Sequence, residues 1–356
     1  MALNQNAGAV RTDTPIIAAV GEIMLRLSPR DPGSRVINSD TFLVEPGGSE
    51  SNVAVALSLL GNRCRFITKL PNHVLSDKIT RYLRGYGVDT SHICFGGKRL
   101  GMYWTEIGSG PRPHSVHYDR ENSSFSEIDL PDVDFEASLH GVSWIHTSGI
   151  TPAVSKAACD FILHALGHVY ESMHISIDLN FRSKLWLWAK KSKQTIHDTL
   201  WAMCAKAVLI CGNETDFTDC LGFPPAAGAD GYRKAAEGCF ERLPNLKYVA
   251  VSLRDSISAS HNKWSGLLFV KNDRAVQAFE GTTYDLHPVI DRVGVGDSFV
   301  AGIIHGIHHY PDDPKKILDF AVALSALNHT VRGDASQFSV QEVENVMSNP
   351  SGKIIR

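Results

Sequence analysis

The sequence predicts an α/β fold, with a mostly parallel central sheet, helices on both of its faces and a second, small sheet at one edge. Three observations support this fold class. From residue 142 onward, short apolar segments alternate steadily with helical patterns, as in parallel sheets covered on both faces. Two more polar β-like regions, at about 22–48 and 95–125, interrupt the pattern. The chain has 356 residues, enough to bury a large core without disulfides.

The first part of the chain supplies the start of the sheet and the polar β regions. An apolar run at 15–22, PIIAAVGE, predicts a buried first strand. GGSESNVAVALSLLG (47–61) predicts a turn and then an apolar helix closed by a glycine. The remaining predictions are one or two half-exposed strands in 35–45, a strand at 65–70, a helix at 73–86 and a hairpin at 99–120 around GSGPRP.

The second part alternates strands and helices. Strands are expected at 142–149, 174–180, 207–212 and 247–253, and helices at about 153–171, 194–205 and 229–243. A strand at 288–290 is expected to lead into a glycine-rich stretch, and helices at 297–309 and 314–331 to finish the core. The sequence therefore predicts one domain over 15–348, with tails at 1–14 and 349–356.

Composition excludes several classes of partner. The net charge is −3 and the isoelectric point is near 6.6, which gives no electrostatic reason to expect nucleic acid or an anionic membrane as the partner. No apolar run approaches the roughly 18 residues that span a bilayer. The seven cysteines are scattered without a CxxC pair, so we expect reduced cysteines in a cytoplasmic protein.

Polar residues directly follow most of the predicted strands. In α/β sheets, ligands bind beyond the carboxyl ends of the strands. The sequence therefore predicts that a site is built from the segments 47–52, 147–151, 178–182, 213–216, 252–254 and 291–297.

The stretch DRVGVGDSFVAG (291–302) is the most informative of these segments. It has Phe299 where a dinucleotide fingerprint needs glycine, and no lysine after Gly296 as in a P-loop. What remains is a turn whose backbone N–H groups can converge on a phosphoryl group at a helix start. Asp297 beside them either accepts a proton from an attacking hydroxyl or caps its own helix. The sequence leaves both alternatives open.

DRVGVGDSFVAG resembles the C-terminal signature of the PfkB (ribokinase-like) carbohydrate kinases, commonly Asp-x-x-Gly-Ala-Gly-Asp-x-Phe-x-x-Gly, with Val295 in place of alanine. GGSESNVAVALSLLG resembles the N-terminal signature of the same family. The resemblance covers essentially 15–348 and implies a ribokinase-like fold in which the small sheet is a lid. The segments 21–29, 146–153, 178–186, 252–260 and 329–334 resemble the branch that phosphorylates 2-keto-3-deoxygluconate at its terminal hydroxyl.

The resemblance also implies roles for individual residues. Asp297 would be the base, and the backbone of Gly294, Val295 and Gly296 would hold the γ-phosphate of ATP. A small-molecule sugar acid would be held by Gly48, Asn52, Tyr103, Tyr118, Arg120 and Arg182. The chemistry agrees, because a guanidinium matches the planar fork of a carboxylate. For Arg120 and Arg182, the alternative that remains open is a role in ion pairs at the protein surface.

ATP and Mg²⁺ are the cofactors that the resemblance implies. NETD (213–216) resembles the family's Asn-x-x-Glu motif, so Asn213 and Asp216 would organise Mg²⁺ through water, or simply start a helix. Ser252, Arg254 and Asn328 would meet the nucleotide, although Asn328 could equally be an exposed helix residue.

The family often forms homodimers through its lid, and Met102 and Trp104 would supply an apolar lid face. The alternatives in function are a kinase for a related keto sugar acid, fructose or ribose, or a catalytically silent scaffold.

Overall fold

A computed structural model describes residues 15–31, 33–170, 172–225, 228–272 and 275–349. Its central sheet has the strand order β13-β12-β11-β10-β9-β8-β1-β4-β5, with β14 also paired to β12. The strands from β11 to β5 in that order are parallel to one another. They are β1 (Ile16–Val20), β4 (Arg63–Leu70), β5 (Ile93–Phe95), β8 (Val142–Ser148), β9 (His174–Asp178), β10 (Leu209–Asn213) and β11 (Tyr248–Ser258).

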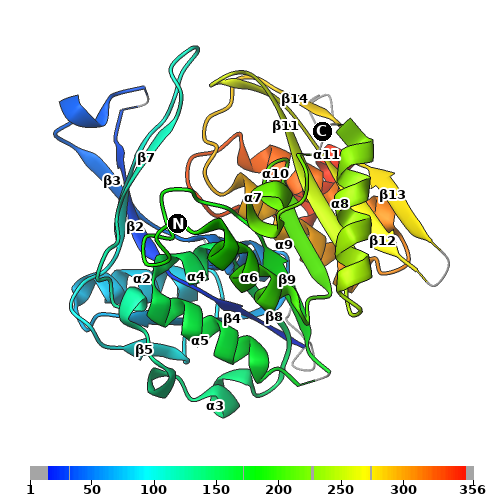
Figure 1. Ribbon diagram of the computed structural model, residues 1–356. Helices are drawn as coiled ribbons and strands as arrows, with labels where there is room; N and C mark the ends of the chain where they lie inside the picture. Colours follow the sequence, from blue (N-terminus) through cyan, green and yellow to red (C-terminus); the bar gives the residue numbers. More distant parts are fainter. Residues whose placement is uncertain (1–14, 32, 171, 226–227, 273–274, 350–356) are drawn as a thin grey trace.

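Two hydrophobic cores lie on the two faces of this sheet. Figure 1 shows the helices that cover these faces. In β1, Ala18 and Val20 pack into one core and Ile17 and Ala19 into the other, which explains why the strand is continuously apolar. The first core is covered by α3 (Phe135–Leu139), α4 (Ile150–Val154), α5 (Lys156–Gly167), α6 (Lys193–Cys204), α7 (Asp216–Leu221) and α8 (Gly228–Arg242). The second is covered by α1 (Ser49–Leu59), α2 (Val74–Gly85), α9 (Val295–His309), α10 (Pro314–Asn328) and α11 (Val340–Ser348). The predicted α/β class with helices on both faces is confirmed.

A separate four-stranded sheet, the lid, projects from one side of the main body (Figure 1). Its order is β3-β2-β6-β7, formed by β2 (Met24–Pro29), β3 (Phe42–Gly47), β6 (Met102–Glu106) and β7 (Ser115–Asp119). All four strands fall within the two polar regions that predicted a small sheet. Within 35–45, however, residues Val36–Asn38 form a 3-10 turn before β3. Further 3-10 turns are Phe125–Glu127 and Leu130–Asp132.

The sequence did not predict the antiparallel end of the main sheet. There β12 (His261–Lys271) pairs antiparallel with β11, β13 (Val276–Glu280) and β14 (Tyr284–Leu286). The strand expected at 288–290 is wrong. Pro288 has no N–H for a ladder, and the N–H groups of Val289 and Ile290 donate instead to the carbonyls of Ser260 and His329.

The described part of the chain contains no helix that is both long and apolar enough to cross a membrane. All seven cysteines carry free thiols. The predicted tails, 1–14 and 349–356, lie outside the described residues except for Asn349.

Candidate active site

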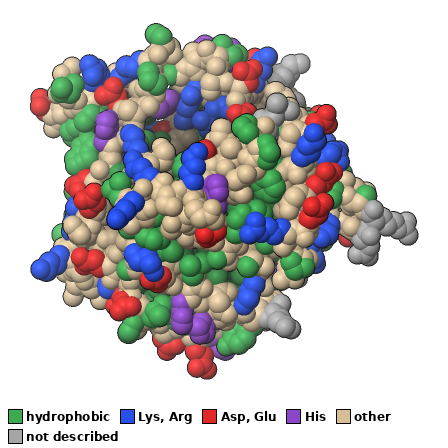
Figure 2. Space-filling view, in the orientation of Figure 1, with side chains coloured by type: hydrophobic (Ala, Val, Ile, Leu, Met, Phe, Trp, Pro, Cys, Tyr) green, Lys and Arg blue, Asp and Glu red, His purple; other side chains and the backbone are tan. Residues whose placement is uncertain are grey.

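A pocket of about 1010 Å³ lies between the lid and the carboxyl ends of the parallel strands. Figure 2 shows its opening, with basic side chains at the rim. Such a volume is at the upper end of the range for small-molecule sites. The predicted site residues that line it are Gly48, Asn52, Tyr103, Tyr118, Arg120, Arg182, Asn213, Asp216, Ser252, Arg254, Gly294, Gly296 and Asp297.

Two predicted site residues do not present side chains to this pocket. The Val295 side chain is fully buried in the core beneath α9, so only its backbone could serve the site. Asn328 ends α10 and is also fully buried, with its Nδ2 donating to the Asp334 carbonyl at 3.4 Å. The alternative of an exposed Asn328 is therefore wrong.

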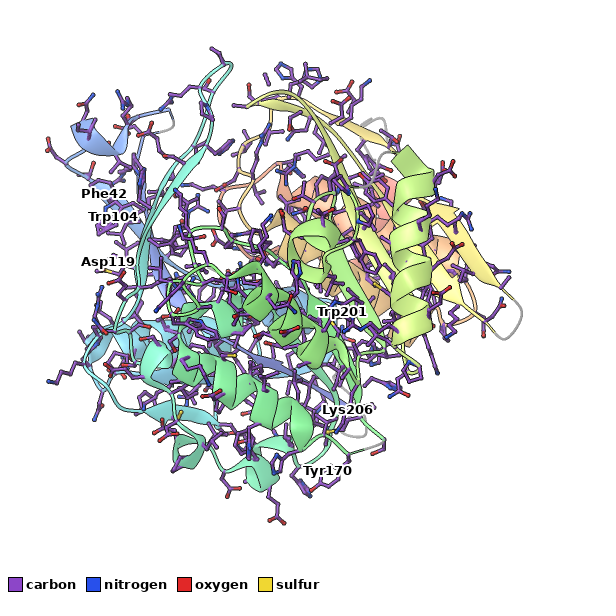
Figure 3. All side chains as sticks on the ribbon, viewed as in Figure 1. Phe42, Trp104, Asp119, Tyr170, Trp201 and Lys206 are labelled. Atoms are coloured by element: carbon purple, nitrogen blue, oxygen red, sulfur yellow. The ribbon has the colours of Figure 1, made fainter. Side chains whose placement is uncertain are left out.

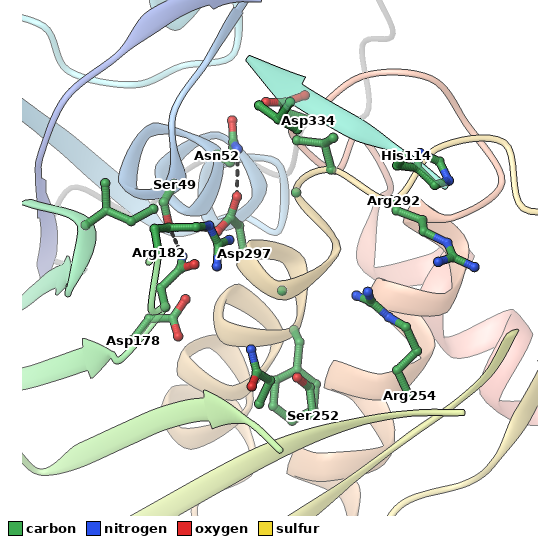
Figure 4. Close-up of a pocket in the computed structure, with 18 of the residues that line it drawn as sticks. Ser49, Asn52, His114, Asp178, Arg182, Ser252, Arg254, Arg292, Asp297 and Asp334 are labelled. Carbon is green, nitrogen blue, oxygen red and sulfur yellow. Dashed lines mark hydrogen bonds between the residues drawn. The ribbon is translucent and has the colours of Figure 1, made fainter. Parts of the chain in front are cut away.

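Asp297 stands in the first turn of α9 with its carboxylate held from across the pocket (Figure 4). Ser49 Oγ donates to Oδ1 at 2.8 Å, and Asn52 Nδ2 donates to Oδ2 at 2.7 Å. Asn180 Nδ2 donates in turn to Ser49 Oγ at 2.9 Å. These contacts aim the carboxylate into the pocket, whereas a capping carboxylate would bond the backbone of its own helix.

Burial raises the pKa of Asp297 to about 6, although the bonds from Asn52 and Ser49 oppose the shift. The predicted role of Asp297 as a base needs its ionised form, and the ionised fraction falls as pH falls below that pKa. We therefore expect kcat/KM to drop about tenfold per pH unit below about pH 6 and to level off above it. A pH profile of initial rates checks this. A limb near pH 4, the usual range of an aspartate, would contradict the assignment.

The glycine-rich start of α9, residues 294–297, which comprises the N-cap Gly294 and the first helical residues, is called the anion loop below. Gly294 has φ +77°, a left-handed conformation that favours glycine, and an added Cβ would lie 1.6 Å from the Asp334 carbonyl oxygen. At Gly296 an added Cβ meets nothing within 4 Å, although the residue lines the pocket. Gly294 is thus explained by the fold, whereas the bare backbone at Gly296 leaves room for a ligand beside a helix N-terminus.

The end of the pocket under the lid carries two arginines with different partners. Arg120 is buried and paired with Glu22, with its Nε donating to Oε2 at 2.9 Å. Arg182 has no carboxylate within ion-pair distance among the described residues, and its Nη1 donates to the carbonyl of Phe181 at 2.9 Å. The surface ion-pair alternative is therefore wrong for both arginines. Arg120 is paired but buried, and Arg182 forms no ion pair with any residue that the structure describes. Arg182 points toward Asp297 (Figure 4).

Asn213 and Asp216 bond to each other at the start of α7. Asn213 Oδ1 accepts from the N–H of Asp216 at 3.2 Å, and Asp216 Oδ2 accepts from the N–H of Asn213 at 2.9 Å. Asp178, at the end of β9, lies nearby, and its pKa is raised well above its usual value by burial and by the charges of Asp216 and Asp297. The described residues contain no cluster of three or more His, Cys, Asp or Glu ready to hold a metal. A divalent cation there would keep most of its waters, as Mg²⁺ does, and these carboxyl groups fit that outer role.

Two further lining arginines, Arg254 and Arg292, face each other across the pocket (Figure 4). Burial and the neighbouring Arg292 lower the pKa of Arg254 to about 10. Arg292 is fixed by its Nη2, which donates to the Ser258 carbonyl at 2.5 Å. Two guanidinium groups turned toward one another repel unless an anion lies between them, and phosphate groups are anions that fit.

Several residues of the site were not singled out from the sequence, namely Glu22, Ser49, Glu50, Asp178, Asn180, Arg292 and Asp334. Most of them lie in the segments after predicted strands from which the sequence already predicted a site. Their position directly after a strand was therefore the signal that could have identified them. Asp334 follows a helix instead of a strand and gave no such signal.

The fold as a whole matches known kinases. A solved structure of 2-dehydro-3-deoxygluconokinase from Thermotoga maritima superposes with a TM-score of 0.88 at 38% identity, covering 94% of this chain and 99% of the other. The 2-dehydro-3-deoxygalactonokinase of Haloferax volcanii is 29% identical over 96% of this chain and its own full length. The 2-dehydro-3-deoxygluconokinase of Thermoproteus tenax is 28% identical over 89% of each chain. The fold is therefore that of the ribokinase-like sugar phosphotransferases.

Residues 15–256 match the model of the pfkB family carbohydrate kinases. The chain belongs to this family. It is a phosphotransferase that acts on a hydroxyl of a small-molecule sugar and uses ATP. The match ends before the anion loop, so the resemblance of 291–302 to a family signature is a separate observation.

Proposed function

We propose that the protein phosphorylates the terminal (C6) hydroxyl of 2-keto-3-deoxygluconate, also called 2-dehydro-3-deoxygluconate, to give 2-keto-3-deoxy-6-phosphogluconate. The observation that carries this proposal is that one pocket holds both the buried carboxylate of Asp297 and the guanidinium of Arg182, which forms no ion pair with the described residues. The first provides a base for a hydroxyl, and the second a partner for the carboxylate at the other end of a sugar acid.

The proposed reaction is in-line transfer from ATP. Asp297 accepts the proton of the sugar hydroxyl as that oxygen attacks the γ-phosphorus, and the bond from that phosphorus to the bridging oxygen of ADP breaks. N–H groups of Gly294, Val295 and Gly296 stabilise the charge on the transferred group. Ser252 and Arg254 contact the nucleotide, with Asn328 acting through the Asp334 backbone that it contacts. Bound Mg²⁺ would neutralise phosphate charge, with Asn213 and Asp216 holding its waters.

The sugar acid would lie under the lid. Gly48 and Asn52 would contact its hydroxyls, and Tyr103, Tyr118, Arg120 and Arg182 would surround its remaining groups. Because Arg120 is already paired with Glu22, we assign the substrate carboxylate chiefly to Arg182. We further propose that 15–348 acts as one kinase domain with 22–48 and 95–125 as its lid. The free thiols support a cytoplasmic location.

The names of the relatives also support a keto-deoxy sugar acid, and they include both the gluconate and the galactonate epimer. A coupled assay of ATP consumption tests the proposal with both epimers, fructose and ribose as substrates. We expect the highest kcat/KM with one of the two acids. Equal or better use of fructose or ribose would refute the sugar-acid assignment.

We propose that the protein is a homodimer formed through the outer face of the lid. The ladder pairs Leu27 with both Val44 and Trp104, so these side chains share one face. Figure 3 shows Phe42 and Trp104 on the side of the lid that is turned away from the main body. Val44 is 38% exposed there, and an apolar sheet face open to water favours a partner surface.

The Val44→Asp variant tests the dimer. A carboxylate placed in an apolar interface should weaken dimerisation at least about tenfold, which sedimentation equilibrium measures. Val74→Asp is the matched control, because Val74 is 76% exposed on α2, outside the lid. If the wild-type protein sediments as a monomer, or if both variants sediment as dimers, the proposed interface is wrong.

A further inference from the structure

Arg26, on lid strand β2, is fully buried between two carboxylates. Its Nη2 lies 2.5 Å from Asp291 Oδ2, and its Nη1 bonds to Asp334 Oδ1. Its Nε donates to Thr105 Oγ1 at 3.0 Å, so every nitrogen of the guanidinium has a partner. Burial opposes the charge of Arg26, but Asp334 and Asp291 together raise its pKa. Buried ion networks are often no more stable than apolar side chains of similar size, so stability alone does not explain this one.

Both carboxylates belong to segments that shape the anion loop. Asp291 Oδ1 accepts from the N–H of Arg292 at 2.8 Å and of Val293 at 3.1 Å. These two residues directly precede Gly294. The Asp334 carbonyl oxygen occupies the space where a side chain on Gly294 would otherwise stand. Arg26 therefore holds the start of the anion loop through one carboxylate and the segment packed against that loop through the other.

The same network reaches the sugar side of the pocket. Tyr103 stands directly opposite Arg26 in the parallel ladder of β2 and β6, and its hydroxyl bonds to Asp334 Oδ2. An added Cβ on Gly47 would lie 2.1 Å from that hydroxyl and 2.5 Å from Asp334 Oδ2. The glycine at this position makes room for the contact. The buried guanidinium of Arg26 thus connects the lid, the sugar side of the pocket and the anion loop.

We propose that Arg26 is a positioning residue that holds the anion loop in its phosphate-binding conformation and couples it to the lid. The proposal rests on the proposed role of the anion loop as the site of the γ-phosphate. Arg26 itself does not line the pocket, so its effect passes through Asp291 and Asp334. Without the guanidinium, two buried carboxylates would repel each other beside Gly294, and the loop would shift.

The Arg26→Ala variant tests this inference through nucleotide binding as well as turnover. We expect its affinity for the non-hydrolysable analogue adenosine 5′-(β,γ-imido)triphosphate to fall about tenfold or more. The affinity for ADP, which lacks the γ-phosphate, should change much less, and kcat should fall with little change in the KM of the sugar. Guanidinium ion at concentrations too low to denature should restore both losses, because the variant leaves a guanidinium-sized space between two carboxylates.

Arg65→Ala is the matched control. Arg65, on β4, is also buried, and its Nε lies 2.9 Å from Asp89 Oδ2. Neither residue lines the pocket. Its loss should lower stability but leave analogue binding and kcat unchanged, with no rescue by guanidinium. If Arg26→Ala does not fold, Arg26→Lys carries the test, because one ammonium cannot bridge both carboxylates as a planar fork does.

Parent-like analogue affinity and kcat in Arg26→Lys, or in a folded Arg26→Ala, would overturn the proposal and leave Arg26 a purely structural residue. Failure of the proposed function gives a different result. In that case the wild-type protein would bind the analogue without phosphorylating either sugar acid, and the effect of Arg26 on binding would still be measurable.

Discussion

The Asp297→Asn variant is expected to lose at least about 10²-fold in kcat, the usual low end for removal of a positioned base. Asparagine has the same shape. Its one carbonyl oxygen can still accept from Asn52, and its amide group can donate to the Ser49 hydroxyl oxygen, so the pocket should keep its geometry. What it cannot do is take a proton from the sugar hydroxyl. Because substrate contacts elsewhere are intact, we expect kcat and kcat/KM to fall together, the pattern of an interaction made only in the transition state.

Asp77→Asn provides the comparison for this variant. Asp77 is an exposed acid in the first turn of α2, so like Asp297 it lies near a helix start, but it is outside the pocket. Its replacement removes only a favourable charge at a helix start and should leave steady-state rates unchanged. Near-normal turnover in Asp297→Asn would reduce Asp297 to a structural residue.

The second large effect is expected from Arg182→Ala. Losing a charge-assisted, bidentate partner should lower kcat/KM for sugar acids about 10- to 100-fold. Neutral sugars such as fructose have no carboxylate to lose, so their kcat/KM should change little. Parallel kinetics with both classes of sugar measure the ratio that decides the assignment.

Arg182→Lys refines the test, since lysine keeps the charge but not the fork, and partial loss is expected. Arg233→Ala, on α8 and outside the pocket, controls for loss of an arginine as such. Equal losses for acids and neutral sugars in Arg182→Ala would show that Arg182 supports the pocket without reading the carboxylate.

The sequence predicted most of the pocket because two local rules combine there. Apolar runs marked the buried strands, and in a parallel sheet the polar residues after those strands must meet at one edge. Asn52, Arg182, Asp216 and Ser252 come from four separate segments and all line the same pocket. Whether Asp297 faced the pocket or capped its helix could not be decided locally, because the answer depended on Ser49 and Asn52, about 250 residues away along the chain.

What the sequence could not predict depends on long-range pairing. Arg26 lies between two leucines in MLRLSP, where alternation predicts that its side chain faces solvent. It is instead fully buried, and it pairs with two carboxylates more than 260 residues away along the chain. Asp291, which had no role from its sequence context, turns out to be one of these partners. The antiparallel β12–β14 were missed because they depend on strand pairing, of β12 with β11 and of β13 and β14 with β12, and not on local periodicity.

The buried free thiols of the two cores can report local unfolding of the protein, because each core contains cysteines. Cys204 and Cys239 lie in the core on one face of the central sheet, and Cys64 and Cys211 in the core on the other. Burial raises the pKa of each of these thiols, and it is the thiolate that reacts with alkylating reagents. At neutral pH, each of these cysteines should therefore be alkylated only after local unfolding exposes the core that contains it. The order in which these cysteines are modified would reveal which side of the sheet opens first.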